Sequence, residues 1–135
     1  MFSKFIKIIS VLAVMFVMTW VNLNYRGAEK LSQGDVLLSE KRERLAYETY
    51  AEVISMHYAP FSPQVRKAFD LIVNYGSASE KRGEYEKALW AYALASNSFP
   101  PLLYTPYGNE RRALKKRALA VSQKIGSNAR DSLLP

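Results

Sequence analysis

Residues 83–100 read GEYEKALWAYALASNSFP, with a glycine at one end and a proline at the other. Between them, large apolar and small side chains recur at steps of three and four residues, which is typical of one face of an α-helix. They are Tyr85, Ala88, Leu89, Tyr92, Ala95 and Phe99. Trp90 and Leu94 lie on the opposite side. Because a helix that is apolar on two sides is usually enclosed by neighbours, we expect Trp90 to pack against the following helix.

The same pattern occurs 42 residues upstream. Gly34 aligns with Gly76, Ala46 with Ala88, and Tyr50 with Tyr92. At an offset of 43, FSP (61–63) aligns with YTP (104–106). A hydroxyl residue followed by proline is typical of an N-cap and the first position of a helix. The sequence therefore predicts a repeated pair of helices, with helix starts at Pro63 and Pro106.

We predict an all-α fold with no strands. The expected helices span residues 25–38, 41–57, 63–80, 84–98 and 106–125, with a turn at 81–83 and a stop at Gly126. The first of these helices is either separate from the apolar N-terminal segment or continuous with it. The predicted organisation is an anchor at 1–24, a helical domain at 25–126 and a disordered tail at 127–135.

The N-terminal segment, MFSKFIKIISVLAVMFVMTWVNLNY, contains two lysines and no acidic residue. As a helix, residues 5–23 would span about 28 Å, close to the roughly 30 Å of a bilayer interior. The side chains expected to face lipid are Phe5, Ile8, Val11, Leu12, Val14, Phe16, Val17 and Trp20. We therefore predict an uncleaved transmembrane anchor. A cleaved signal peptide, which needs small residues where WVNLNY stands, and a buried helix of a soluble protein are the alternatives.

The net charge of +7 indicates an anionic partner or surface. Basic residues flank the apolar segment on both sides, so the positive-inside count does not separate its two faces cleanly. Because short basic N-terminal tails usually remain inside, we expect a single-pass protein of the inner membrane whose domain is extracytoplasmic.

Few residues suit catalysis. The chain has no cysteine and a single histidine, His57, which is expected to complement a helix dipole. It contains no phosphate-binding loop, no GxGxxG and no set of residues at metal-ligand spacing. We therefore expect a protein that is not an enzyme, with no cofactor, no metal and no small-molecule substrate.

The stretch at 83–100 resembles the second helix of a tetratricopeptide repeat. The matching positions are Gly83, Tyr85, Ala88, Tyr92, Ala95 and Pro100, with Gly76 in the helix before and Gly34, Ala46 and Tyr50 in the first unit. The spacing of 42–43 exceeds the family's period of about 34 residues, and the excess lies between units. The tryptophan that the family usually has in the first helix of each unit is absent from both units. Long inter-unit loops of this kind resemble repeats of bacterial envelope proteins, including lipoproteins of outer-membrane assembly.

The resemblance implies protein binding. Such units form a groove lined by the first helix of each unit, here residues 25–38 and 63–80, with Arg66, Asn74 and Ser77 as candidate contacts. Trp90, if exposed, is another candidate. The basic run at 110–117 is either a solvated helix face or a contact for lipid headgroups or an acidic partner. Its candidate residues are Arg111, Arg112, Lys115 and Lys116. Nucleic acid is not expected, because no recognised binding module surrounds this run.

The functional hypothesis is a membrane-anchored scaffold or assembly factor of a bacterial envelope complex. Its expected partners are membrane lipid and other membrane or envelope proteins. The alternative is a structural subunit whose transmembrane helix itself packs within a larger membrane complex. The scaffold needs only some transmembrane anchor, whereas the structural subunit needs the particular sequence of its anchor for assembly.

Overall fold

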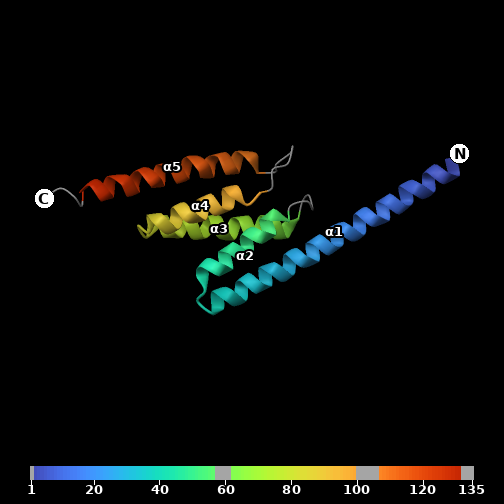
Figure 1. Cartoon of the computed structure of the whole chain (residues 1–135), viewed down its shortest axis with the longest axis horizontal. Coiled ribbons are helices and arrows are strands. Elements are labelled where there is room, and N and C mark those ends of the chain that lie inside the picture. The colour runs from blue at the N-terminus through green and yellow to red at the C-terminus, as the bar shows by residue number, and fades with distance from the viewer. Residues whose placement is uncertain (1, 57–61, 100–106, 132–135) are drawn as a thin grey trace.

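The computed structural model describes residues 2–56, 62–99 and 107–131. Side chains are described for residues 4–56, 62–99 and 107–127. The described residues form five α-helices and no strand, which confirms the predicted fold class. The helices are α1 (Phe2–Ser39), α2 (Glu43–Ser55), α3 (Pro63–Lys81), α4 (Tyr85–Asn97) and α5 (Gly108–Asp131) (Figure 1).

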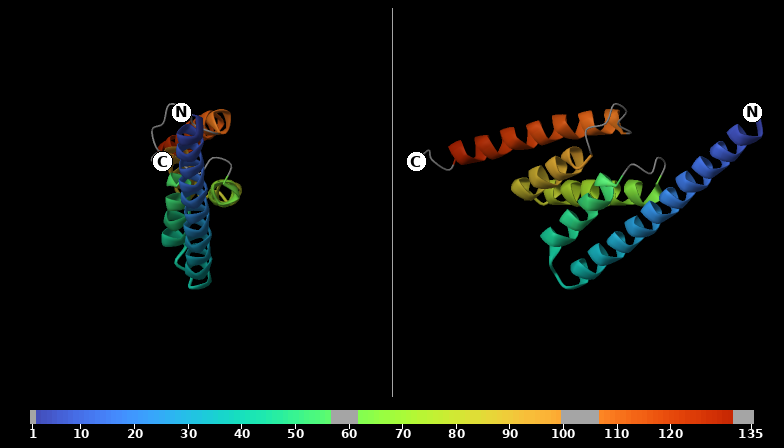
Figure 2. Two further views of the ribbon diagram at one scale, coloured as in Figure 1. Left: turned by 90° about the vertical axis from the view of Figure 1, so that its right-hand side faces the viewer. Right: turned by 45° about the vertical axis from the view of Figure 1, so that its right-hand side comes forward.

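Successive helices pack against each other and alternate in direction (Figure 1). α1 also contacts α3, and α2 also contacts α4, so the pairs α1–α2 and α3–α4 stack side by side while α5 covers α4. The core between them contains Tyr50, Ile54, Ile72, Tyr92 and Val121, each fully buried. The N-terminal half of α1 projects beyond the array (Figure 2).

Each helix pair is held by a tyrosine packed on a glycine. A Cβ built at Gly76 would lie 2.7 Å from Cε1 of Tyr92, and one built at Gly34 would come still closer to Cε1 of Tyr50. Both tyrosine rings are fully buried and both hydroxyls reach a carboxylate: Tyr50 donates to Asp35 at 2.5 Å and Tyr92 to Glu80 at 2.9 Å. The two tyrosine–glycine contacts stand 42 residues apart in sequence, and in both the ring atoms Cε1 and Cδ1 lie nearest to the glycine.

The turns that close the two pairs share the same backbone hydrogen bonds. After α3, Gly83 N–H donates to Glu80 O at 3.0 Å and Glu84 N–H to Ser79 O at 2.9 Å. The turn after α1 has the same two bonds at positions 42 residues earlier. Lys41 N–H donates to Leu38 O at 3.0 Å, and Arg42 N–H donates to Leu37 O at 2.9 Å. This is the Schellman arrangement, which needs a left-handed residue after the helix. Gly83 supplies it at φ +78°, and Lys41 supplies it at φ +60° despite its side chain.

Two predicted boundaries at α5 are wrong, for local reasons. The helix begins at Gly108 because Tyr107, at φ +64°, interrupts helical geometry; Pro106 itself lies outside the described residues. The helix also passes through Gly126 and ends at Asp131. A Cβ at Gly126 would meet nothing within 4 Å, so the glycine costs about 1 kcal/mol of helix propensity and nothing else. Pro100 and His57 also lie outside the described residues.

The predicted start of α3 is confirmed at Pro63, but its cap works differently from the expectation. Ser62 makes no side-chain hydrogen bond to the backbone of the first turn. Its hydroxyl instead lies 3.0 Å from Asn24 Oδ1 and 2.9 Å from Gln64 Oε1. Ser62 therefore ties the beginning of α3 to the middle of α1.

α1 is one uninterrupted helix with two different surroundings. Over residues 4–22 every side chain is exposed; Phe5 is 66% and Met18 69% accessible. Beyond residue 26, Gly27, Leu31 and Gly34 are buried against the array. The interpretation of the apolar segment as a buried helix of a soluble core is therefore wrong, and the helix is long and apolar enough to span a membrane.

The tyrosine–glycine contact gives the first testable prediction. Gly76→Ala should lower the free energy of unfolding by about 1–3 kcal/mol, because the added methyl group collides with the buried Tyr92 ring. Gly34→Ala should cost at least as much. Chemical unfolding in detergent micelles, followed by far-UV circular dichroism, measures both.

The matched control is Gly126→Ala, a glycine inside α5 with open space around it. This variant should gain roughly 0.5–1 kcal/mol from helix propensity. Equal effects of alanine at positions 76 and 126 would contradict the packing described.

Candidate functional site

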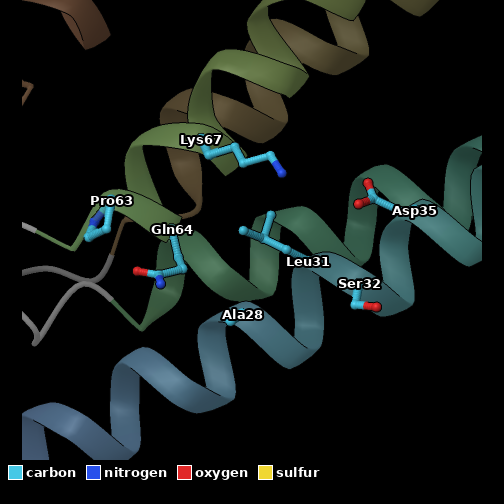
Figure 3. A pocket seen from close by; sticks show the side chains of 7 residues that line it. All are labelled: Ala28, Leu31, Ser32, Asp35, Pro63, Gln64 and Lys67. Carbon is cyan, nitrogen blue, oxygen red and sulfur yellow. The ribbon is translucent and has the colours of Figure 1, made fainter.

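A depression of about 370 Å³ lies between α1 and α3. Its lining residues are Ala28, Leu31, Ser32, Asp35, Pro63, Gln64 and Lys67 (Figure 3). Four come from α1 and three from α3, which are the first helices of the two pairs. We call this depression the α1–α3 groove; it lies between the helices where the resemblance places a binding groove.

The groove combines an apolar floor with polar walls. Leu31, 5% exposed, forms part of the floor. Lys67 extends from α3 into the gap, and the Asp35 carboxylate lies across it on α1 (Figure 3). One oxygen of Asp35 is fixed by the Tyr50 hydroxyl. Such a surface suits a short polypeptide segment, because it offers both signs of charge, hydrogen-bonding groups and a limited apolar contact.

The residues chosen from sequence as groove contacts do not line this groove. Arg66 bridges α3 to α5: its guanidinium donates to Asp70 at 3.0 Å and to Glu110 at 2.7 Å, and lies 5.3 Å from the Tyr107 ring centre. Asn74 is exposed on α3, and Ser77 accepts a bond from Arg117. The lining residues of α1, at 28, 31, 32 and 35, follow helical spacing, which was the signal available in the sequence.

Trp90 does not pack on α5, so that prediction is wrong. α5 covers the side of α4 that carries Tyr85, Tyr92 and Ser96, through contacts with Lys124, Arg117 and Arg111. Trp90 stands two residues from Tyr92, which is about 200° around the helix. It meets α3 and α2 instead: its ring lies edge-on to Tyr75, and the Arg44 guanidinium lies 5.8 Å from its centre.

The basic residues of α5 divide into two groups. Arg111 donates to Ser96 O at 2.9 Å and lies 5.0 Å from the Phe99 ring centre, so it fastens α5 to the end of α4. Arg112, Lys115 and Lys116 are exposed, and Arg112 bonds only to the neighbouring Asn109 among the described residues. α5 carries seven basic and two acidic residues, so it accounts for +5 of the net charge of +7.

Glu80 joins three helices at one carboxylate. It accepts hydrogen bonds from Tyr92 Oη and Arg117 Nε, each at 2.9 Å, and from Lys124 Nζ at 3.3 Å. Burial raises the pKa of Glu80, but these hydrogen bonds outweigh burial and hold the pKa below its ordinary value. Burial first, and then the bond to Glu80, raise the pKa of Tyr92 to about 12. The cluster therefore keeps Glu80 charged and Tyr92 neutral, and secures α5 on α3 and α4.

Comparison of the chain with known protein families, curated proteins and solved structures gave no match. Within residues 2–56, 62–99 and 107–131, no group of three or more histidine, aspartate or glutamate side chains is placed to hold a metal ion.

The Glu80 cluster gives the second prediction. Because the folded pKa lies below the ordinary value of 4.5, the stabilisation is present above that value and is lost as the pH falls through the folded pKa. Glu80→Gln should lower the free energy of unfolding by about 1–2 kcal/mol at neutral pH. It should also flatten the loss of stability in acid.

Urea unfolding in micelles, at neutral pH and below the ordinary Glu80 pKa, measures both effects. Glu29→Gln, on the exposed side of α1, is the control and should leave both values unchanged. An acid dependence that is the same in Glu80→Gln and in the unmodified chain would refute the assignment to Glu80.

Proposed function

We propose that this chain is a single-pass membrane protein whose helical domain is a scaffold, and that the α1–α3 groove holds a segment of a partner in the same membrane. The observation that carries this proposal is the continuity of α1. The helix whose N-terminal half is exposed and apolar also forms one wall of the groove. Binding surface and anchor are thus parts of one rigid element.

This continuity limits how far the groove lies from the bilayer. If the membrane ends near residue 23, Ala28 lies about 8 Å and Asp35 about 18 Å beyond it along the helix. A segment that immediately follows or precedes a partner's own transmembrane helix falls in this range. A soluble peptide would find the same groove, but without the advantage of confinement to the membrane.

Confinement compensates for a small binding surface. Two helix pairs provide one groove of about 370 Å³, which is near the lower end of ligand pockets and predicts weak intrinsic affinity. Anchoring both proteins in one membrane raises their effective concentration and offsets this weakness. The proposal therefore explains why a small repeat domain is joined directly to an anchor.

The resemblance to tetratricopeptide repeats supports the scaffold proposal. Two features of the structure agree with this resemblance: the glycine–tyrosine contact occurs in both helix pairs, and the turns at residues 41 and 83 have the same hydrogen bonds. We further propose that the protein resides in the inner membrane of a bacterial envelope with its domain extracytoplasmic, as the basic N-terminal tail suggests. A reporter fused after residue 135 tests the orientation: a reporter active only in the cytoplasm would contradict it.

A structural subunit is the second candidate. The observation that favours it is the apolar surface of residues 4–22, which no described part of the chain covers. In that case the sequence of the anchor helix would matter for assembly. The two candidates differ in their response to exchange of the anchor for a plain apolar helix of equal length.

The third prediction concerns site-specific crosslinking in native membranes. A photoreactive residue at Ser32 or Lys67 should crosslink a partner, whereas the same residue at exposed Asn74, outside the groove, should crosslink it several-fold less. A flexible glycine–serine insertion after Asn24 should reduce the crosslinks at both groove positions, because it frees the groove from its fixed height. Equal crosslinking at 32 and 74 would contradict binding in the groove.

Exchange of residues 4–23 for an unrelated apolar helix of the same length separates the two candidates. Retained crosslinks at Ser32 and Lys67 support the scaffold. Loss of the crosslinks, with the domain folded and inserted, supports the structural subunit instead.

A further inference from the structure

A second depression, of about 350 Å³, lies where α2, α3 and α4 meet. Its lining residues are Glu43, Arg44, Tyr75, Glu86, Lys87 and Trp90, and we call it the distal pocket. Glu43 begins α2, and Glu86 and Lys87 lie in the first turn of α4. Both starts are at the end of the array remote from the projecting half of α1 (Figures 1 and 2).

Two aromatic rings form a corner in this pocket. The Tyr75 and Trp90 rings are perpendicular, at 89°, with centres 6.5 Å apart. Tyr47 stacks on Tyr75 with centres 4.1 Å apart, which fixes the position of that ring. Aromatic faces attract cations through their quadrupole, and tryptophan does so most strongly. The corner therefore favours a cationic group.

The charged side chains around this aromatic corner also favour a cationic ligand. The basic groups at the pocket already have carboxylate partners. Arg44 Nε lies 3.1 Å from Glu48. Lys87 Nζ and Arg82 Nε share Glu84, each at 2.6 Å. Glu43 accepts only a long bond, 3.3 Å, from the Tyr75 hydroxyl. Glu86 has no ion-pair partner among the described residues and is exposed. With Glu43 and Glu86 included, four carboxylates stand against three basic groups. The surplus negative charge favours an incoming cation.

A guanidinium suits this pocket better than an ammonium group. Arg44 already places its guanidinium over the Trp90 ring, at 5.8 Å, so the chain itself shows this type of stacking at the pocket. A planar guanidinium also donates several hydrogen bonds while it stacks, whereas an ammonium group is a compact, strongly hydrated charge. An arginine side chain could stack in the corner and donate to Glu43 and Glu86 together.

The position of the pocket excludes the protein's own bilayer as the source of the cation. From residue 23 to its end at Ser39, α1 extends about 24 Å, and the distal pocket lies at that far end. Lipid headgroups do not extend so far. We propose that the distal pocket binds an arginine side chain of a protein segment that approaches from the aqueous phase. This site is separate from the α1–α3 groove, and only the exclusion of lipid headgroups rests on the membrane anchor proposed above.

Intrinsic fluorescence tests this proposal in the full chain held in maltoside micelles. Trp20→Phe leaves Trp90 as the only tryptophan. The probe is a blocked glycine–serine pentapeptide with one central arginine, and its control carries citrulline, which has the same shape without the charge. The arginine peptide should change the Trp90 emission saturably and bind at least tenfold more tightly than the citrulline peptide.

Variants then assign the effect to the pocket. Glu43→Gln and Glu86→Gln should each weaken binding of the arginine peptide several-fold, with unchanged helical content. Glu29→Gln, on the exposed side of α1, should leave it unchanged. Equal binding of the arginine and citrulline peptides, or no saturable response, would overturn the proposal. Tighter binding of tetramethylammonium than of the arginine peptide would also overturn it, by assigning a quaternary ammonium ligand.

Discussion

A single helix that has to satisfy two surroundings determines most of this architecture. The first half of α1 exposes apolar side chains on every side, while its second half buries one stripe, Gly27, Leu31 and Gly34, against the array. The hydrogen bonds of an α-helix are internal to the segment, so the backbone needs no adjustment between a lipid and an aqueous environment. No proline interrupts α1. The domain is consequently oriented by the helix that would anchor it.

Within the domain, small residues determine how closely the helices approach. Gly34 and Gly76 allow the rings of Tyr50 and Tyr92 to lie against the backbone of the preceding helix, and each hydroxyl then ends at a carboxylate. The carboxylates, Asp35 and Glu80, are not at corresponding positions of the two helix pairs. The packing of the ring is therefore the same in both pairs, whereas the partner of the hydroxyl differs in position. α5 is the last helix of the described array. Its inner stripe covers α4, and its outer face is polar and basic, which is typical of a helix that covers the end of a helical array.

The parts of this structure that the sequence could predict depend on local chemistry. The turn at Gly83, the start of α3 at Pro63 and the stripe through Tyr85, Ala88, Tyr92 and Ala95 follow from backbone preference and helical period. The features that the sequence does not predict depend on contacts between helices. Lys41 adopts a glycine-like conformation because the turn requires it. Arg66 bridges α3 to α5 because Glu110 lies within 2.7 Å, and Trp90 turns toward α2 and α3 because α5 occupies the other side of α4. The α1–α3 groove likewise exists only once both helices are placed.

α1 continues without a break from the apolar segment into the wall of the groove. The chain has no cysteine, so spin labels placed by Ser10→Cys and Val36→Cys would be specific. Both positions are exposed, and 26 residues of unbroken helix separate them by about 39 Å. Double electron–electron resonance in lipid nanodiscs should give one narrow distance distribution near that value. A broad distribution, or one centred well below it, would mean that the helix bends or breaks between the two labels and would contradict a continuous α1.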